Sequence, residues 1–260
     1  MNIFKQLFKS LYSPKDIARF RFQGIGKTIL FVFILGFLSI IPAIIQVATI
    51  GEGLFSEGEE LLLNDLPSFE VQNGQLQTDV SSTVEASSSG ITFYVDGSDE
   101  LASDGLTNED AAVAFLSDRL AVATGGSVQE YQYDTFEGFD LSSAGIASLL
   151  NSLEGAKFII YFFILAFIFI LVAGMLFIKA TIFGWIGTKL AASTERKLTY
   201  RHSFRMAAYS SALPAVFFLI ADLAGSIIPF GTLINWFVTG LILYLSIKEI
   251  PKPKKKAVSA

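Results

Sequence analysis

Four long apolar runs divide the chain, and polar segments separate them. The runs cover residues 28–50, 158–178, 206–230 and 233–247. All but the last reach the roughly 20 residues that a helix needs to cross about 30 Å of hydrocarbon. The last run is shorter and follows directly after a "PFGT" turn, which is typical of the return half of a helical hairpin. The pattern therefore predicts four transmembrane helices.

The second apolar run continues past Lys179 as far as Thr188. At 1.5 Å per residue, a continuous helix over 158–188 would be about 46 Å long, which exceeds the thickness of the hydrocarbon. Two alternatives follow: the helix projects into the cytoplasm, or it bends near Gly184 and Gly187. In either case we expect the Lys179 ammonium group to extend to the inner membrane interface.

The composition agrees with a membrane protein, and the charges are unevenly distributed. Hydrophobic residues make up 52% of the 260 residues and the mean hydropathy is +0.54, which is too apolar for an ordinary soluble domain. Residues 51–155 contain 20 of the 24 acidic residues but only one of the 19 lysines and arginines, Arg119. The chain has no cysteine, which excludes disulfides and thiolate metal ligands.

The positions of the basic residues predict the orientation. Lysines and arginines cluster in the N-terminal flank, in the segment between the second and third runs, and in the C-terminal tail. Because short cytoplasmic segments carry an excess of these residues, both termini should be cytoplasmic and the acidic segment should face outward. Cleavage of the first run as a secretory signal is the rival interpretation, but the run is long and no AxA-like site follows it.

The expected fold class is an α-helical integral membrane protein with a small antiparallel β-rich extracytoplasmic domain between the first two of its four transmembrane helices. The bilayer is its first partner. The predicted segments are a cytoplasmic amphipathic basic flank (1–27), helix one (28–50), an acidic outer domain (51–155), helix two with its extension (156–188), a basic cytoplasmic loop (189–205), helix three (206–230), helix four (231–249) and a basic cytoplasmic tail (250–260).

The N-terminal flank begins with an amphipathic pattern, "NIFKQLFKSLYS". Its apolar residues recur at helical spacing, while Lys5, Gln6, Lys9 and Ser10 take the other face. The following "SPKD" predicts a second short helix with Ser13 as its cap. The flank is either an element that senses lipid or docks a partner, or a passive basic anchor, and the same alternatives hold for the tail.

The outer segment predicts a small antiparallel sheet. "SFEVQNGQLQTD" alternates apolar and polar residues around Asn73 and Gly74, which is a strong hairpin signal. The Ser-rich residues 80–90 should form a loop, and "ITFYV" alternates again. Residues 107–133 are ambiguous, but β-branched residues and the Gly125-Gly126 pair favour strands. "AGIASLLNSL" predicts a helix that leads into the second span.

Most chemistries lack the residues that they need. "RFQGIGKTILF" ends like a phosphate-binding loop, but Arg21 occupies the place of the required first glycine, so no nucleotide site is expected. "DGSDELASDG" has Leu101 where a calcium-binding EF-hand loop needs glycine, which leaves at most a loose cation site. His202 is the only histidine, so a zinc pair or an outward serine triad is excluded. We expect no enzymatic activity, catalytic residue, cofactor, metal site or nucleic-acid partner.

Asp222 is the one acidic residue within an apolar run. An intramembrane carboxylate is a functional candidate by default, and Ser226, one turn away, or Asn235, across the hairpin, are its possible partners. Such a group would suit proton or cation handling. The alternative is that Asp222 lies near enough to the outer interface to be hydrated and to have a structural role only.

"RHSFRMAAYSSALPA" places small residues at helical spacing. Ala207, Ser211 and Ala215 repeat every four residues, which makes a surface that another helix can approach closely. Pro214 frees a backbone carbonyl and allows a kink. This face packs either within the same bundle or against another membrane protein or a second copy of the chain.

Three stretches carry a resemblance to a known group: "FKQLFKSLYSPKDIARFRFQGIGKTI", "LPSFEVQNGQLQ" and "RHSFRMAAYSSALP". They resemble a domain-of-unknown-function family of bacterial four-span membrane proteins often described as maltodextrin utilisation proteins, which is distantly similar to the Yip-like membrane proteins. The resemblance implies a plasma-membrane protein of Gram-positive bacteria and no catalytic residues. Tyr131, Tyr133 and Phe136 could contribute to a sugar site, but they fit a sheet face as well.

The sequence therefore favours a non-enzymatic accessory, scaffold or sensor protein of the bacterial plasma membrane. Its context would be carbohydrate uptake or envelope homeostasis. The alternative is a transport component for a small solute or cation that uses Asp222.

Overall fold

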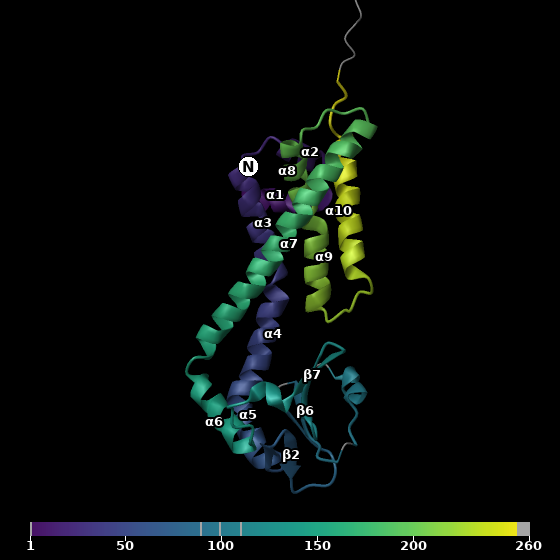
Figure 1. Ribbon diagram of the computed structural model, residues 1–260. Helices are drawn as coiled ribbons and strands as arrows, with labels where there is room; N and C mark the ends of the chain where they lie inside the picture. Colours follow the sequence, from purple (N-terminus) through teal and green to yellow (C-terminus); the bar gives the residue numbers. More distant parts are fainter. Residues whose placement is uncertain (1, 89, 99, 110, 254–260) are drawn as a thin grey trace, which may run out of the picture. The chain divides into compact units, whose positions relative to one another are not determined.

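The computed structural model describes residues 2–88, 90–98, 100–109 and 111–253 (Figure 1). The chain forms two compact units. The helical unit comprises Met1–Ile44 and Ile164–Ala260, and the β-rich unit comprises Ile45–Phe163. Three lysines of the predicted basic tail, Lys254, Lys255 and Lys256, lie outside the described residues.

The helical unit contains short helices at its N-terminus and longer apolar helices. α4 and α7 each extend over the boundary between the two units. The helices are α1 (Ile3–Tyr12), α2 (Pro14–Phe20), α3 (Ile25–Ser39), α4 (Ile41–Glu52), α7 (Lys157–Ser193), α8 (Tyr200–Ser210), α9 (Ala212–Leu223) and α10 (Gly231–Lys248).

Four helical stretches of the described residues are long and apolar enough to cross a membrane, which confirms the number of apolar helices predicted from the sequence. They indicate a membrane protein. The stretches are Ile25–Phe55, Lys157–Ser193, Tyr200–Leu223 and Gly231–Lys248.

Of the two alternatives for the second span, the structure has the continuous one, because α7 is an unbroken helix through Gly184 and Gly187. These glycines serve helix packing instead. A Cβ atom at Gly184 would lie 3.1 Å from the backbone Cα of Phe204 in α8, and one at Gly187 would meet the side chain of Ser203. The glycines therefore let α8 lie close against α7.

The predicted third span, 206–230, is interrupted and ends early. α8 and α9 are separate helices that meet at Ser211, and the second one ends at Leu223. Pro214 explains the interruption, since its ring clashes with the carbonyl group four residues earlier, that of Ser210. After the helix, Gly225 has a φ of 66°, which ends the helical path.

The polar face predicted for α1 is only partly exposed, since Lys5 is exposed and Lys9 is half-buried. Gln6 and Ser10 are fully buried, whereas Phe4, Phe8 and Tyr12 are exposed. Hydrogen bonds within the core explain the burial of these two polar side chains. The Tyr209 hydroxyl donates to Gln6 Oε1 at 2.8 Å, and the Ser10 hydroxyl donates to the Gln6 carbonyl oxygen at 2.8 Å. A polar contact with α8 therefore joins the packing of Ile3, Leu7 and Leu11 in holding α1 against the core.

The start of α2 is as predicted. The Ser13 hydroxyl oxygen accepts a hydrogen bond from the Asp16 backbone N–H, and Pro14 is the first residue of the helix. The core of the helical unit centres on Tyr209, whose ring centroid lies 4.3 Å from that of Phe31 and 4.8 Å from that of Phe20. These contacts join α2, α3 and α8.

The β-rich unit contains a two-stranded hairpin, a five-stranded sheet and short helical segments. Its helices are α5 (Gly58–Glu60) and α6 (Ser143–Glu154), with π-helical turns at Gly53–Glu57 and Leu61–Asp65 and 3-10 turns at Ser103–Asn108 and Tyr133–Phe136. Its strands are β1 (Phe69–Gln72), β2 (Gln75–Thr78), β3 (Val84–Ser88), β4 (Ile91–Val95), β5 (Ala111–Phe115), β6 (Arg119–Thr124) and β7 (Ser127–Gln132).

The predicted hairpin, the strands after residue 110 and the helix before the second span are confirmed. Asn73 and Gly74 both have positive φ values, 52° and 76°, as a tight two-residue turn between β1 and β2 requires. Two expectations were wrong. Residues 80–90 are not all loop, because β3 lies there, and the sheet is not wholly antiparallel, because β4 and β5 are parallel.

The long connection between β4 and β5 permits their parallel pairing. A parallel pairing needs a crossover of a dozen or more residues, and the chain between Val95 and Ala111 is long enough. The sheet order is β3-β4-β5-β6-β7, and its other pairs are antiparallel. Helix α6 and the turns before β1 cover one face, while Leu106 lies in the apolar cluster of the other.

Candidate functional site

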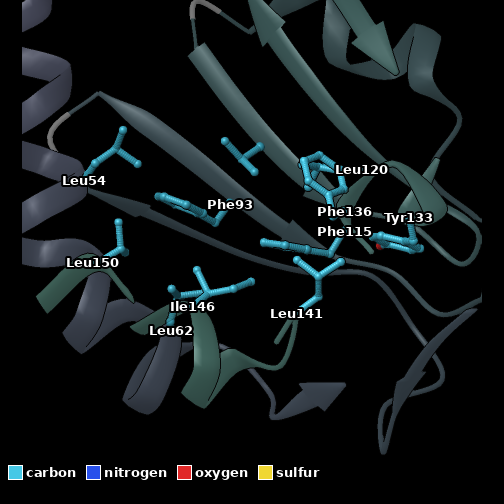
Figure 2. Close-up of a pocket in the computed structure, with 11 residues that line it drawn as sticks. Leu54, Leu62, Phe93, Phe115, Leu120, Tyr133, Phe136, Leu141, Ile146 and Leu150 are labelled. Carbon is cyan, nitrogen blue, oxygen red and sulfur yellow. The ribbon is translucent and has the colours of Figure 1, made fainter. Parts of the chain in front are cut away.

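The β-rich unit contains a cavity of about 210 Å³ (Figure 2). Only carbon atoms form its lining surface. The side chains around it are Leu54, Leu62, Phe93, Val113, Phe115, Leu120, Tyr133, Phe136, Leu141, Ile146 and Leu150.

Strand alternation and helical spacing bring this lining together. Phe93, Phe115 and Leu120 come from β4, β5 and β6, and Phe115 is the direct cross-strand partner of Leu120. Because alternate residues of a strand point to the same face, these side chains all lie on one side of the sheet. Ile146 and Leu150 of α6 are four residues apart and reach the cavity from the helix.

The one polar side chain at the cavity turns its polar atom away. The Tyr133 hydroxyl donates a hydrogen bond to the Leu116 carbonyl oxygen at 2.7 Å. Burial, and secondly the negative charge of Asp118, raise the pKa of this hydroxyl above its ordinary value. The group therefore stays neutral and satisfied, and the ring alone contributes to the lining.

This chemistry restricts what the cavity can hold. A cavity of about 150 Å³ lined by leucine, isoleucine and phenylalanine stays dry and can bind benzene. The present cavity is somewhat larger, about 210 Å³, and has the same kind of lining. Sites for polar molecules place a few hydrogen-bonding groups to fix orientation, and this lining offers none. The arrangement suits an alkyl chain or a ring.

The aromatic residues considered for a sugar site lie in two different surroundings. Tyr133 and Phe136 line the apolar cavity, whereas Tyr131 is exposed and its hydroxyl donates to Gln129 Oε1 at 2.7 Å. A sugar needs hydroxyl partners beside an aromatic ring, and the cavity supplies none.

In the acidic segment considered for a cation site, the first carboxylate, that of Asp96, stabilises a local turn. Asp96 is fully buried and accepts hydrogen bonds from the Ser98 N–H at 2.8 Å, the Ser98 hydroxyl at 2.6 Å and the Leu101 N–H at 2.6 Å. Burial alone would raise the pKa of this carboxyl group, but the hydrogen bonds outweigh it and lower the pKa. Asp96 thus holds the turn that begins the crossover to β5.

The three residues proposed for an intramembrane site share no side-chain hydrogen bond within the described part of the chain. Asp222 is exposed on the last turn of α9, and Ser226 lies beyond the end of that helix. Among the described residues, no side-chain hydrogen bond joins Asp222 to Ser226 or Asn235. The helix ends too early to place Ser226 one turn away on the same face.

Asn235 instead contacts Lys179, and this pair was missed by the sequence reasoning. Lys179 is only 5% exposed, so it does not extend to an interface as expected. Its ammonium group donates a hydrogen bond to Asn235 Oδ1, which joins α7 to α10. The signal was present in the sequence, since Lys179 is the one cation within a long apolar run and a buried cation needs a polar partner.

The small-residue face lies inside the helical unit. Ala207 is fully buried, Ser211 is 2% exposed, Pro214 is buried and Ala215 packs against the central cluster. The Ser211 hydroxyl donates to the Ala207 carbonyl oxygen at 3.2 Å, so it is satisfied within its own helix. In this structure the neighbours of the face are therefore helices of the same chain.

Comparison with known proteins gives one match. Residues 4–247 match the model of a family described as a protein of unknown function, DUF1189. The chain belongs to this family. No curated protein matches the chain, and no solved structure matches it. The match confirms that the chain belongs to a family of unknown function, and it carries no maltodextrin or Yip-like description and no activity.

Proposed function

We propose that the chain is a non-enzymatic integral membrane protein whose β-rich unit binds an alkyl chain in its apolar cavity and acts as a sensor or accessory subunit. The observation that carries this proposal is the cavity itself: a hollow of about 210 Å³ whose lining surface is carbon alone. Removing apolar ligand surface from water supplies about 25 cal/mol per Å², and no hydrogen-bonding group is lost in the process. A hydrocarbon chain is the ligand that such a lining favours.

Photolabelling of the full chain in nanodiscs tests this function. A short alkyl diazirine should label peptides that contain Phe115 or Leu120, and Val113→Phe, which fills the cavity, should reduce that labelling several-fold. Labelling of the apolar helix α7 serves as the internal reference and should not change. Val128→Phe on the other face of the sheet is the matched control. Equal labelling of the cavity peptides in all three proteins would refute alkyl binding there.

The proposed location is the bacterial plasma membrane, with both termini in the cytoplasm and residues 51–155 outside. The support is the uneven charge: the outer segment has one basic residue against 20 acidic ones. Because the chain has no cysteine, single cysteines can report the orientation. An impermeant thiol reagent should label Ser81→Cys but not Ser193→Cys in intact cells. The reverse pattern, or equal labelling, would contradict this orientation.

The second candidate function is transport of a small solute or cation through Asp222. Its support is the position of a carboxylate in an apolar helix. Its weakness is that Asp222 is exposed at the helix end and that Asn235 is occupied by Lys179. The accessory or sensor function is therefore the better supported one.

The wider role inferred from the resemblance, in carbohydrate uptake or envelope homeostasis, stays part of the proposal. An apolar cavity fits the second context better than the first, because envelope lipids contain alkyl chains and maltodextrins do not. A partner protein would couple the occupied β-rich unit to a response. The small-residue face of α8 and α9 is a poor docking site for it, because helices of the same chain already cover Ala207 and Ser211.

A further inference from the structure

Four basic residues of the helical unit gather where the end of α2 meets the start of α8. Arg205 Nη1 donates a hydrogen bond to the Arg21 carbonyl oxygen at 2.9 Å. The Arg21 guanidinium carbon lies 4.2 Å from the centroid of the Phe22 ring, and that ring lies 5.4 Å from the ring of His202. We name Arg21, Arg201, His202 and Arg205 the basic junction.

Like charges act on His202 and on Arg205 within the basic junction. The charges of Arg205, Arg21 and Arg201 all act on the His202 ring, and the charge of Arg201 acts on Arg205. Arg201 and Arg205 are four residues apart on α8, a spacing at which like charges destabilise a helix. Bringing these cations together therefore costs stability unless an anion is present.

No carboxylate relieves this repulsion within the described part of the chain. The ion pairs of the helical unit are Lys9 with Asp16, Arg19 with Asp16, and Lys252 with Glu195, and none involves the basic junction.

Arg205 is the member of the basic junction whose buried charge most needs an anion. It is only 5% exposed, and its Nε is buried without a hydrogen-bond partner in the structure. Arginine is almost never buried without a partner for its charge, and here its neighbours are further cations and a backbone carbonyl. The Nε–H of Arg205 is an unused donor that an incoming anion would satisfy.

Two local features favour phosphate as that anion. Arginine presents donors in a planar fork that matches phosphate oxygens, and the site offers three arginines. Arg201 and His202 belong to the first turn of α8, and the Thr199 side chain does not cap that end, which leaves the positive end of the helix without a side-chain acceptor. Phe22 is 67% exposed next to the arginines, so its ring leaves the site open to a ligand from outside the helical unit.

We propose that the basic junction of Arg21, Arg201, His202 and Arg205 is a phosphate-binding site, filled by the headgroup of an anionic phospholipid or by a soluble phosphate. The site belongs to the helical unit and does not depend on ligand binding in the β-rich unit. An anionic group here holds the end of α2 against α8 and so stabilises the packing of the N-terminal helices.

Thermal unfolding of the purified full chain tests the proposal. One series adds dioleoylphosphatidylglycerol or dioleoylphosphatidylcholine to the detergent micelles. A second series adds sodium phosphate or sodium chloride at equal ionic strength. Stabilisation by the anionic lipid alone assigns the site to a headgroup, and stabilisation by inorganic phosphate as well assigns it to phosphate from either source.

Two exposed basic residues provide the matched variants. Arg201→Gln removes one member of the junction without disturbing the core, and Lys197→Gln removes the same charge four residues earlier, in the connection before α8. We expect Arg201→Gln to weaken the apparent affinity for the stabilising anion about tenfold, as the loss of one charge-assisted hydrogen bond predicts. Lys197→Gln should leave it unchanged. Equal effects of the two variants, or no stabilisation by either anion in the unaltered protein, would overturn the proposal.

Discussion

The two units of the chain place polar and apolar groups in opposite ways. The helical unit buries Gln6, Lys179 and Arg205 among its helices, while apolar side chains such as Phe167 and Ile170 are exposed. The β-rich unit has a carbon-lined cavity at its core. It also carries nearly all the acidic residues of the chain.

This difference reflects the surroundings that we propose for each unit. In hydrocarbon, an exposed apolar side chain costs nothing, and a polar side chain must find its partner inside the bundle. In water, a domain gains stability by burying carbon, and an incompletely filled apolar core is a place where a ligand can add further burial. The interior of each unit therefore shows where function can be sought: polar pairs in the helical unit and an apolar hollow in the β-rich unit.

Breaking the polar pair of the helical unit should have the largest effect. Asn235→Leu leaves the Lys179 ammonium group buried without its partner, and we expect a loss of roughly 3 kcal/mol in the free energy of unfolding. Thermal unfolding in detergent provides the measurement. The double variant Lys179→Met with Asn235→Leu should recover most of the loss, since it removes both polar groups. If the single variant is as stable as the unaltered protein, the pair is not a structural contact.

Overpacking between two helices should have the next largest effect. Gly184→Leu drives a side chain into the backbone of α8, and we expect a loss of roughly 2 kcal/mol. Gly174→Leu in the same helix is the control, because a Cβ atom there meets nothing within 4 Å and helix propensity changes equally. Similar melting temperatures for the two variants would show that α7 and α8 are not closely packed at Gly184.

The β-rich unit offers a smaller, pH-dependent test. Asp96→Asn weakens the hydrogen bonds to the turn after β4 and should reduce stability by about 1–2 kcal/mol at neutral pH. The pKa of Asp96 is lowered in the folded protein, so its contribution is present above the ordinary value of 3.8 and lost as the pH falls below it.

The difference between the unaltered protein and Asp96→Asn should accordingly shrink as the pH is lowered through this range. Asp104→Asn, at an exposed position of the same connection, should change stability little at any pH. A difference that stays constant down to pH 3 would contradict the assigned role of the carboxylate.

The smallest effect is expected at Asp222, and it separates the two candidate functions. Asp222→Asn should change stability by no more than about 0.5 kcal/mol, because the side chain is exposed at the end of α9. The variant should also complement a deletion of the gene, which can be measured by growth or by any phenotype of the deletion strain. Loss of complementation with normal membrane insertion would favour the transport function.

Local sequence signals predicted much of the fold. Apolar runs located all four long helices, and the Asn73-Gly74 pair located the hairpin, because helix length and positive φ values are local requirements. The parallel pairing of β4 and β5 was not predicted, because it depends on the route of the crossover between them. The break at Ser211 was anticipated only as an effect of Pro214.

The candidate sites were less predictable, because they depend on contacts between distant segments. Lys179 and Asn235 lie 56 residues apart, and Gln6 and Tyr209 lie 203 apart, so neither pair can be read from spacing. The cavity takes one residue or a few from each of several elements. Asp222 was conspicuous in the sequence because it is the one acidic residue within an apolar run. That feature alone did not identify a contact of its side chain.

The most direct test of the central claim is to identify what the cavity holds. The full chain and its Val113→Phe variant would be purified in mild detergent from their own membranes and compared by native mass spectrometry. We expect a bound molecule with an alkyl chain in the unaltered protein and its loss in the variant, with the lipids around the helices unchanged. The same bound molecules in both proteins would contradict the claim that the β-rich unit is an alkyl-binding domain.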